Sequence, residues 1–258
     1  MKTFQTLDDF LKESKDLTPN LLFQMSYELN SQEFDCKGFL HISSLMRLFQ
    51  LVAQKDMHSN GHDVMKDIEN GHQWMVRYYQ VSIERFPNPL EKIKVYSWVS
   101  QMERLHATRN FLITQGDQVI SKAASQWFIV NQKVKKFEPM PETYKSNIWD
   151  MNLLDVDIKK VSDLQNTFTR ESRVAYHMID SNQHMNNSYY PLLAAEAVEP
   201  KFRLSHVPHD FQIYFRKEVK FDETIKVLTE LKEGPETVHS LRTDKEELSQ
   251  IIIKWRAI

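Results

Sequence analysis

Stretches in which apolar and polar residues alternate occupy two regions of the chain, and this period of two is typical of half-buried β-strands. Turn-forming segments such as Pro87-Asn88-Pro89 and Gly116-Asp117 separate the stretches of the first region. Its predicted strands are residues 74–85, 92–102, 108–115 and 119–131. The second region repeats the plan with shorter strands, at residues 211–220, 224–232, 238–243 and 248–255. Each region is therefore predicted to form an antiparallel meander.

A helix-like segment lies ahead of each meander, and the two segments share one spacing of apolar residues. In both, apolar residues recur at positions i, i+3, i+4, i+7 and i+8, which places them on one face of a helix. The first set is Leu45, Leu48, Phe49, Val52 and Ala53, and the second, 145 positions later, is Tyr190, Leu193, Ala194, Ala197 and Val198. Ser43 or Ser44 and Asn186 or Asn187 are candidate N-caps. The common offset predicts an internal duplication.

Two units that each contain a helix and a meander predict an α+β fold, in which two antiparallel sheets each wrap round a central helix. This is the tandem, or double, hotdog architecture, although other α+β domains also place a helix on a sheet. We expect a first domain at residues 1–140, a second at 166–258, and a linker of mixed charge without a sustained period at 141–165.

Composition excludes several classes of protein. The net charge is -2 and no long run of Lys and Arg occurs, so no nucleic-acid surface is expected. The single cysteine, Cys36, allows no intrachain disulfide, and the acidic first segment does not suit a secretory leader. No segment approaches the roughly 18 apolar residues of a membrane span. We therefore expect a cytoplasmic protein without membrane insertion, as a monomer or a homodimer.

Polar side chains gather immediately ahead of the second helix, in the segment MIDSNQHMNNSYY. They are Asp180, Asn182, His184, Asn186 and Asn187. One interpretation is a capping loop that satisfies the free N–H groups of the first helical turn. The other is a catalytic loop, in which the helix N-terminus stabilises an oxyanion and His184 acts as a base. On an extended stretch Asp180, Asn182 and His184 would point to one side, and Asp180 could orient the Asn182 amide.

A comparison of the two segments at the offset of 145 residues favours the catalytic interpretation over the capping one. The first segment carries Lys37, Phe39 and His41 at the positions of Asn182, His184 and Asn186. If the polar residues served only as caps, both helices should have a similar set. The difference predicts one catalytic domain and one that has lost its catalytic residues.

Glu218 is the candidate carboxylate that would orient a histidine base and stabilise its charged form. It lies on the predicted strand 211–220, on the face opposite Phe211, Ile213 and Phe215. The alternative is a solvated glutamate or one paired with an arginine.

The segment NQHMNNSYY, followed by Glu196, resembles the Asn-Gln-His-x-Asn-Asn-x-x-Tyr signature of the acyl-acyl carrier protein thioesterases, a family of plant plastid enzymes and bacterial relatives. The resemblance extends over most of the chain, through SYEL at Ser26, WMVRYYQVSIERFPNPLEKIKVYSWVS from Trp74, and ASQWFIVNQKVKKFEPMPE. FRKEV resembles the family's Arg-Arg-Glu-Cys strand, which places Glu218 on the catalytic glutamate. Val219 stands where the family has a cysteine.

This resemblance implies hydrolysis of fatty acyl-acyl carrier protein thioesters to free fatty acid, which ends chain elongation. Because no thiol stands at position 219, it implies a water mechanism. His184 and Glu218 would activate the water, Asn182 would position it or polarise the carbonyl, and Asp180 would hold Asn182.

The implied partner is an acyl carrier protein with a phosphopantetheine-linked fatty acyl chain, whose chain the first domain would house. Trp74, Asn186 and Asn187 are the expected substrate contacts. Basic residues that could meet an acidic carrier, or serve only as solvated strand ends, are Lys133, Lys135, Lys136, Arg170 and Arg173.

Two other functions stay open at this point, a coenzyme A thioesterase or hydratase of the same fold and a non-catalytic acyl-binding regulator. No cofactor is expected. No metal is expected either, because His58 and His62 have one-face helical spacing but no carboxylate or cysteine pattern completes a site around them.

Overall fold

The computed structural model describes residues 2–4, 6–154, 156, 161, 164–165 and 167–258. The chain divides into two compact units. The first unit comprises Met1–Gly38 and Leu48–Val156, and the second comprises Phe39–Arg47 and Asp157–Ile258. The expected linker at 141–165 falls partly outside the described residues, and its described part contains the 3-10 helix η2 (Glu142–Asn147) and the short strand β8 (Met151–Asn152).

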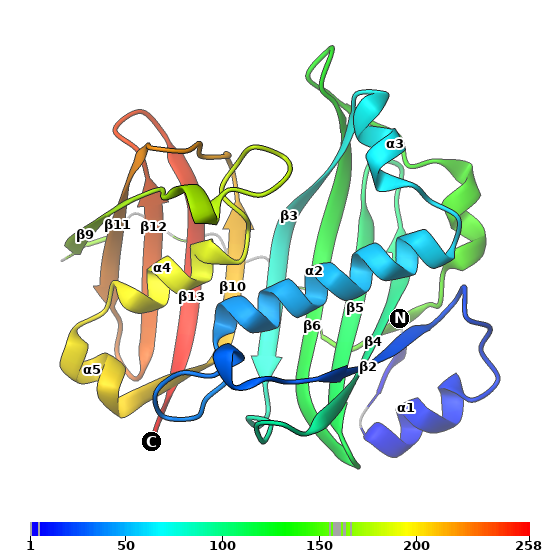
Figure 1. The fold of residues 1–258 in the computed structure, drawn as a ribbon, viewed down its shortest axis with the longest axis horizontal. Coiled ribbons are helices and arrows are strands. Elements are labelled where there is room, and N and C mark those ends of the chain that lie inside the picture. Colours follow the sequence, from blue (N-terminus) through cyan, green and yellow to red (C-terminus); the bar gives the residue numbers. More distant parts are fainter. Residues whose placement is uncertain (1, 5, 155, 157–160, 162–163, 166) are drawn as a thin grey trace. The chain divides into compact units, whose positions relative to one another are not determined.

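The first unit is an antiparallel sheet with a helix on each face. Its strands follow the order β2 (Phe23–Glu28), β4 (Lys92–Met102), β5 (Ala107–Gln115), β6 (Gln118–Asn131) and β3 (His72–Ile83), and β7 (Lys136–Glu138) pairs with β6. Helix α2 (Ile42–Ser59), from Leu48 onward, lies across these strands, and α3 (Val64–Glu69) follows it (Figure 1). The predicted strands are confirmed with small shifts at their ends. The predicted meander holds for β4, β5 and β6 but is wrong for β3, which pairs with β6 and does not lie beside β4.

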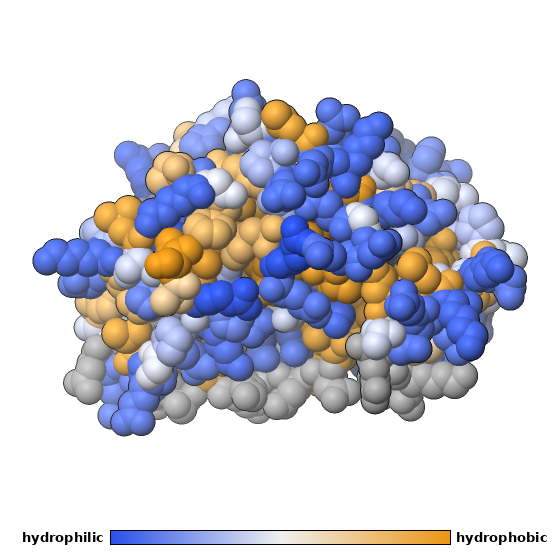
Figure 2. Space-filling model, turned by 90° about the horizontal axis from the view of Figure 1, so that it is seen from below, coloured by the Kyte–Doolittle hydropathy of each residue, from blue (hydrophilic) through white to orange (hydrophobic). Residues whose placement is uncertain are grey.

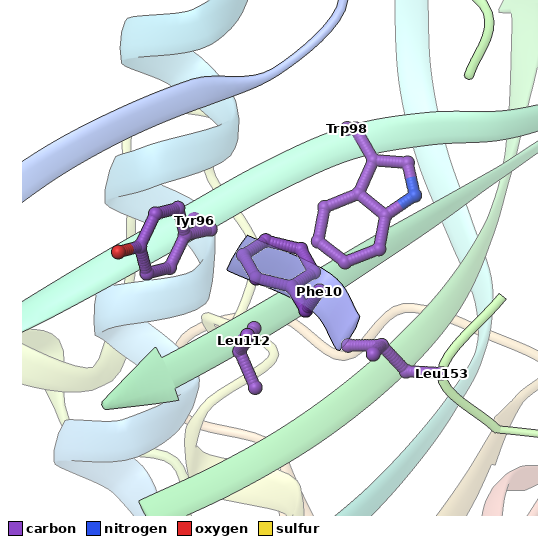
Figure 3. Packing of buried hydrophobic residues seen from close by; sticks show 5 residues of the cluster. All are labelled: Phe10, Tyr96, Trp98, Leu112 and Leu153. Atoms are coloured by element: carbon purple, nitrogen blue, oxygen red, sulfur yellow. The ribbon is translucent and has the colours of Figure 1, made fainter. Parts of the chain in front are cut away.

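Helix α1 (Leu7–Ser14), which the apolar pattern did not predict, explains why the central strands are buried on both sides. Phe10 of α1 packs against Tyr96, Trp98, Leu112 and Leu153 (Figure 3). Because side chains alternate along a strand, Tyr96 and Trp98 face α1 while their neighbours face α2. Every residue of β5 is accordingly buried.

The second unit has the same plan with a shorter helix. Its strands follow the order β10 (His206–Phe215), β13 (Glu247–Ala257), β12 (Glu236–Arg242), β11 (Thr224–Leu231) and β9 (Phe168–Arg173). Helix α4 (Tyr189–Glu196) packs on this sheet, and α5 (Pro200–Ser205) follows it (Figure 1). The predicted strand 211–220 is wrong at both ends, since β10 starts five residues earlier and ends at Phe215.

The predicted duplication is confirmed by elements that were not used to predict it. Strands β2 and β9 are separated by 145 residues at both ends, and so are the 3-10 helices η1 (Ser31–Glu33) and η3 (Tyr176–Met178). The apolar stripe of α2 is buried throughout. The stripe of the second helix is buried except for Leu193, and its last members, Ala197 and Val198, lie beyond the end of α4.

Within the described part of the chain, no helix has both the length and the apolar character needed to cross a membrane. Figure 2 shows one face of the molecule, on which hydrophilic side chains predominate and apolar side chains lie between them.

Candidate active site

The polar loop ahead of α4 is a closed turn built on Asp180, so the extended stretch on which Asp180, Asn182 and His184 would share one side is not formed. The Asn182 N–H donates to Asp180 Oδ1 at 2.9 Å, and the Gln183 N–H donates to the Asp180 carbonyl at 2.9 Å. Gln183 has φ 65°, in the left-handed region, and the Asp180 N–H donates to the His184 carbonyl at 3.0 Å. Asp180 therefore fixes the backbone of Asn182, and among the described residues nothing bonds the Asn182 side-chain amide, which is exposed.

Asn186 joins the turn to the start of the helix. Its Nδ2 donates to Asp180 Oδ2 at 3.1 Å, and its Oδ1 accepts from the Ser188 N–H at 2.9 Å. The Tyr189 N–H donates to the Asn186 carbonyl at 3.0 Å. The predicted N-cap at Asn186 or Asn187 is wrong, because α4 begins at Tyr189 with Ser188 before it. The Asp180 carboxylate thus holds the Asn186 amide in place of the expected Asn182 amide.

Glu218 lies in an irregular segment just after β10, and three sets of hydrogen bonds fix that segment. The Met185 N–H donates to the Val219 carbonyl at 2.9 Å, and the Tyr190 hydroxyl donates to the Lys217 carbonyl at 3.3 Å. The Arg216 and Lys217 N–H groups both donate to the Leu248 carbonyl. Val219, which follows Glu218 in the chain, is fully buried and anchors this end of the segment in the core.

These two segments bring the predicted pair together. His184 Nε2 lies 2.7 Å from Glu218 Oε2. The side chains are 21% and 38% exposed, so water and a substrate can reach the pair. The predicted proximity of an imidazole and a carboxylate 34 positions apart is confirmed, while their catalytic roles stay predictions.

Tyr190 supports this site, and the sequence pattern identified it only as part of the buried helical stripe. Burial raises the pKa of Tyr190, and the charges of Glu218, Asp180 and Glu223 raise it further. The hydroxyl therefore stays protonated and remains a donor to the Lys217 carbonyl. The sequence did contain one signal for this role, because Tyr190 is the tyrosine that ends the family signature.

Arg47 also contacts this loop, although no sequence pattern indicated it. Its Nε–H donates to Ser188 Oγ at 3.4 Å, and its guanidinium carbon lies 5.1 Å from the centre of the Tyr189 ring. Arg47 belongs to the second unit with the residues that it contacts.

The other two expected substrate contacts, Asn187 and Trp74, stay predictions. Asn187 is partly buried in the loop ahead of α4. Trp74 belongs to the first unit, where it lines an apolar cavity of about 50 Å³. In the described ranges, no group of three or more His, Cys, Asp or Glu side chains is arranged to hold a metal ion.

Two family models match the chain. The model described as the acyl-ACP thioesterase N-terminal domain matches residues 20–148, and the acyl-ACP thioesterase C-terminal domain model matches residues 161–257.

Curated relatives are similar at low identity. An acyl-[acyl-carrier-protein] hydrolase, FATB3, of Cuphea viscosissima is 23% identical over 86% of this chain and 59% of its own length. A palmitoyl-acyl carrier protein thioesterase of Gossypium hirsutum is 22% identical over 83% of this chain and 56% of its own length. The chain spans less than two thirds of the length of these two relatives.

Solved structures share the fold. A 12:0-ACP thioesterase from Umbellularia californica matches with a TM-score of 0.82 and 20% identity, covering 92% of this chain and 98% of that one. An acyl-ACP thioesterase from Bacteroides thetaiotaomicron matches with a TM-score of 0.84 and 18% identity over the same shares. The predicted α+β tandem hotdog fold is confirmed.

Proposed function

Since the chain belongs to the acyl-ACP thioesterase family, we propose that it hydrolyses fatty acyl thioesters of acyl carrier protein to free fatty acid and carrier protein. The contact of 2.7 Å between His184 and Glu218 carries this proposal. A base held by a carboxylate, partly open to solvent, is the arrangement that water activation needs.

The pair acts as one base. Neutral His184 donates its Nε2–H to the Glu218 carboxylate, which leaves the Nδ1 lone pair to accept a proton from water. The water oxygen bonds to the thioester carbon as the proton moves to Nδ1, and Glu218 stabilises the imidazolium that forms. When the carbon–sulfur bond breaks, the imidazolium returns the proton to the leaving phosphopantetheine thiolate.

The Asn182 amide is the candidate donor to the carbonyl oxygen or to the attacking water, because no described residue binds it. Asp180 contributes by fixing the turn that carries Asn182 and His184. The first turn of α4 contains Pro191, which has no N–H, so the helix start supplies fewer backbone donors for an oxyanion than an ordinary helix.

The first unit is proposed to hold the acyl chain. Its cavity lies between α2 and the sheet and is lined by Ala53, Met57, Trp74, Val99, Met102, Ala107, Arg109, Trp127 and Tyr144. The cavity is smaller than typical ligand sites, but thioether side chains such as Met57 and Met102 adapt to a bound chain.

The test is fatty acid release by the purified protein from acyl carrier protein esters of several chain lengths. We expect hydrolysis that is faster than that of the matched coenzyme A esters. A strong preference for coenzyme A esters would make the protein a coenzyme A thioesterase. No release from any ester would leave a non-catalytic acyl-binding protein and contradict the proposal.

A further inference from the structure

A buried ion pair joins the helix and the sheet of the first unit. Asp56 of α2 is 5% exposed and Arg109 of β5 is 9% exposed. Arg109 Nη1 donates to Asp56 Oδ2 and, at 2.8 Å, to Ser97 Oγ. The other Asp56 oxygen accepts from Asn60 Nδ2 at 2.8 Å. The carboxylate therefore has a partner on each oxygen.

The guanidinium is not satisfied in the same way. All its hydrogen bonds to described residues leave from Nη1, so the Nε–H and the Nη2 hydrogens have no protein acceptor there. Arg109 lines the cavity of about 50 Å³, whose other walls are aromatic, methionine and small apolar side chains. Because Arg109 lines this cavity, an oxygen atom of a ligand bound there could accept hydrogen bonds from these donors.

A second donor borders the same cavity. Burial raises the pKa of the Tyr144 hydroxyl to about 12, an effect that Asp67 strengthens and Arg109 opposes. Tyr144 therefore stays protonated, and it lines the cavity together with Arg109. Its ring is held in place by His62, stacked at 3.9 Å between centroids, and by the Trp74 ring at 5.6 Å.

We propose that this cavity binds an acyl chain that carries an oxygen substituent, a hydroxyl or a keto group, and that Arg109 and Tyr144 bind that oxygen. The inference rests on the proposed function. A neutral oxygen fits better than a second carboxylate, because Asp56 already neutralises Arg109 and would repel another negative charge. An ion pair that only anchored α2 to the sheet would need neither the cavity nor the unpaired donors.

The test compares carrier protein esters of one chain length, one saturated and the others with a hydroxyl or keto group at successive positions. We expect kcat/KM for at least one oxygenated chain to exceed that of the saturated chain about 10-fold, the gain typical of one added hydrogen bond. Equal rates at every position would overturn the proposal.

The informative variant is the double substitution Asp56→Leu with Arg109→Met, because replacing both members of a buried pair by apolar residues preserves folding better than removing one. The readout is the ratio of oxygenated to saturated rates, which should fall to about one. The control, Lys226→Met with Asp244→Leu, removes an exposed ion pair of the second unit and should leave the ratio unchanged. A ratio that survives the double substitution would overturn the proposal.

A binding measurement separates this inference from the proposed function. Trp74 and Trp127 line the cavity, so their fluorescence reports an occupant. Titration with a free hydroxy fatty acid should give a Kd about 10-fold lower than titration with the saturated acid, the gain typical of one added hydrogen bond. This result would stand even if no thioester were cleaved, and equal affinities would contradict the inference even in an active enzyme.

Discussion

The two halves contain the same turn, but only the second half is proposed to be catalytic. The Lys37 N–H donates to Asp35 Oδ1 at 2.9 Å and the Gly38 N–H to the Asp35 carbonyl at 2.9 Å. The turn at Asp180 repeats both bonds at the same distances, 145 residues later. The aspartate is therefore required by the turn in either half. Under the proposed mechanism, the catalytic difference between the halves lies in the positions that differ, above all Phe39 and His184.

The two turns also differ in backbone strain. Gly38 has φ 81° in the first half, and Gln183 has φ 65° at the corresponding position of the second. Glycine adopts this region without a steric cost, whereas an L side chain raises the energy by roughly 1–2 kcal/mol. Strain of this kind is found where the surrounding structure holds a functional loop.

The interiors of the units differ as well, on strand β5 of the first and strand β12 of the second. Arg109 on β5 is charged, paired and next to a cavity. His239 on β12 is fully buried, with Nδ1 2.9 Å from Thr229 Oγ1 and Nε2 2.7 Å from Thr237 Oγ1. Burial lowers the pKa of His239 to about 3, so its ring is neutral. The first interior keeps a polar group for a ligand, and the second uses one to hold strands together.

The largest expected effect comes from giving the second turn the residue of the first. His184→Phe should lower kcat/KM for acyl carrier protein esters about 10²–10⁴-fold, the range for loss of a general base. Circular dichroism should show an unchanged fold, because the turn depends on Asp180. The reciprocal Phe39→His is the control and should not raise the rate. Activity retained by His184→Phe would contradict the assignment.

Acid should destabilise the second unit through His239. Its pKa is about 3 when folded and near 6.5 when unfolded, so the unfolded chain binds more protons between these values. The contribution of the neutral His239 ring to the free energy of unfolding is complete above pH 6.5 and is lost progressively as the pH falls toward 3. Between pH 7 and pH 5, urea unfolding should show a loss of stability in the unsubstituted protein that exceeds the loss in His239→Gln by about 2 kcal/mol. Identical pH slopes for both proteins would contradict this.

Charge reversal should distinguish the basic groups of the two halves. Lys133, Lys135 and Lys136 are exposed and, among the described residues, form no ion pair, whereas Arg173 is paired with Asp222 at 2.7 Å. Replacing the three lysines by glutamate should raise KM for acyl carrier protein esters about 5-fold at low salt, since exposed charges steer an acidic partner. Neutral pantetheine esters are the control substrate.

The Arg173→Glu variant is the matched control for this experiment and should change KM less. An equal rise of KM for the neutral pantetheine esters would show that the lysines act on something other than the carrier.

The smallest effect concerns the strained residue. Gln183→Gly should raise the free energy of unfolding by up to about 1 kcal/mol, because relief of strain is partly offset by the entropy of the unfolded chain. Gly38→Gln should lower the free energy of unfolding by about 1 kcal/mol. No atom lies within 4 Å of an added Cβ, so the cost comes from the left-handed backbone conformation and not from a steric clash with neighbours. Chemical unfolding measures both, and opposite signs would contradict the comparison.

The sequence predicted the long elements because their apolar period is strong, as in the stripes of α2 and the strands of both meanders. Helix α1 escaped prediction because it is short and one residue, Phe10, supplies its buried contact. Strand β9 escaped prediction because buried and exposed residues do not alternate along it. The pairing of Glu218 came from the family resemblance, and its place beyond β10 could not be predicted from alternation.

The roles inside the turn were beyond pattern reasoning for a physical reason. A glutamine at positive φ gives no compositional signal, so the sequence suggested only what Asp180, Asn182 and His184 would do on an extended stretch. The left-handed Gln183 reverses the chain there and directs the Asp180 carboxylate to the Asn182 backbone and the Asn186 amide.

The central claim is that His184 and Glu218 act as one base, and a double-mutant cycle tests it most directly. The values of kcat/KM are measured for the unsubstituted protein, His184→Ala, Glu218→Gln and the double variant. If the pair is one unit, the double variant should be no slower than the slower single variant, within about 3-fold. Losses that multiply, so that the double variant falls by the product of the two single losses, would contradict the account.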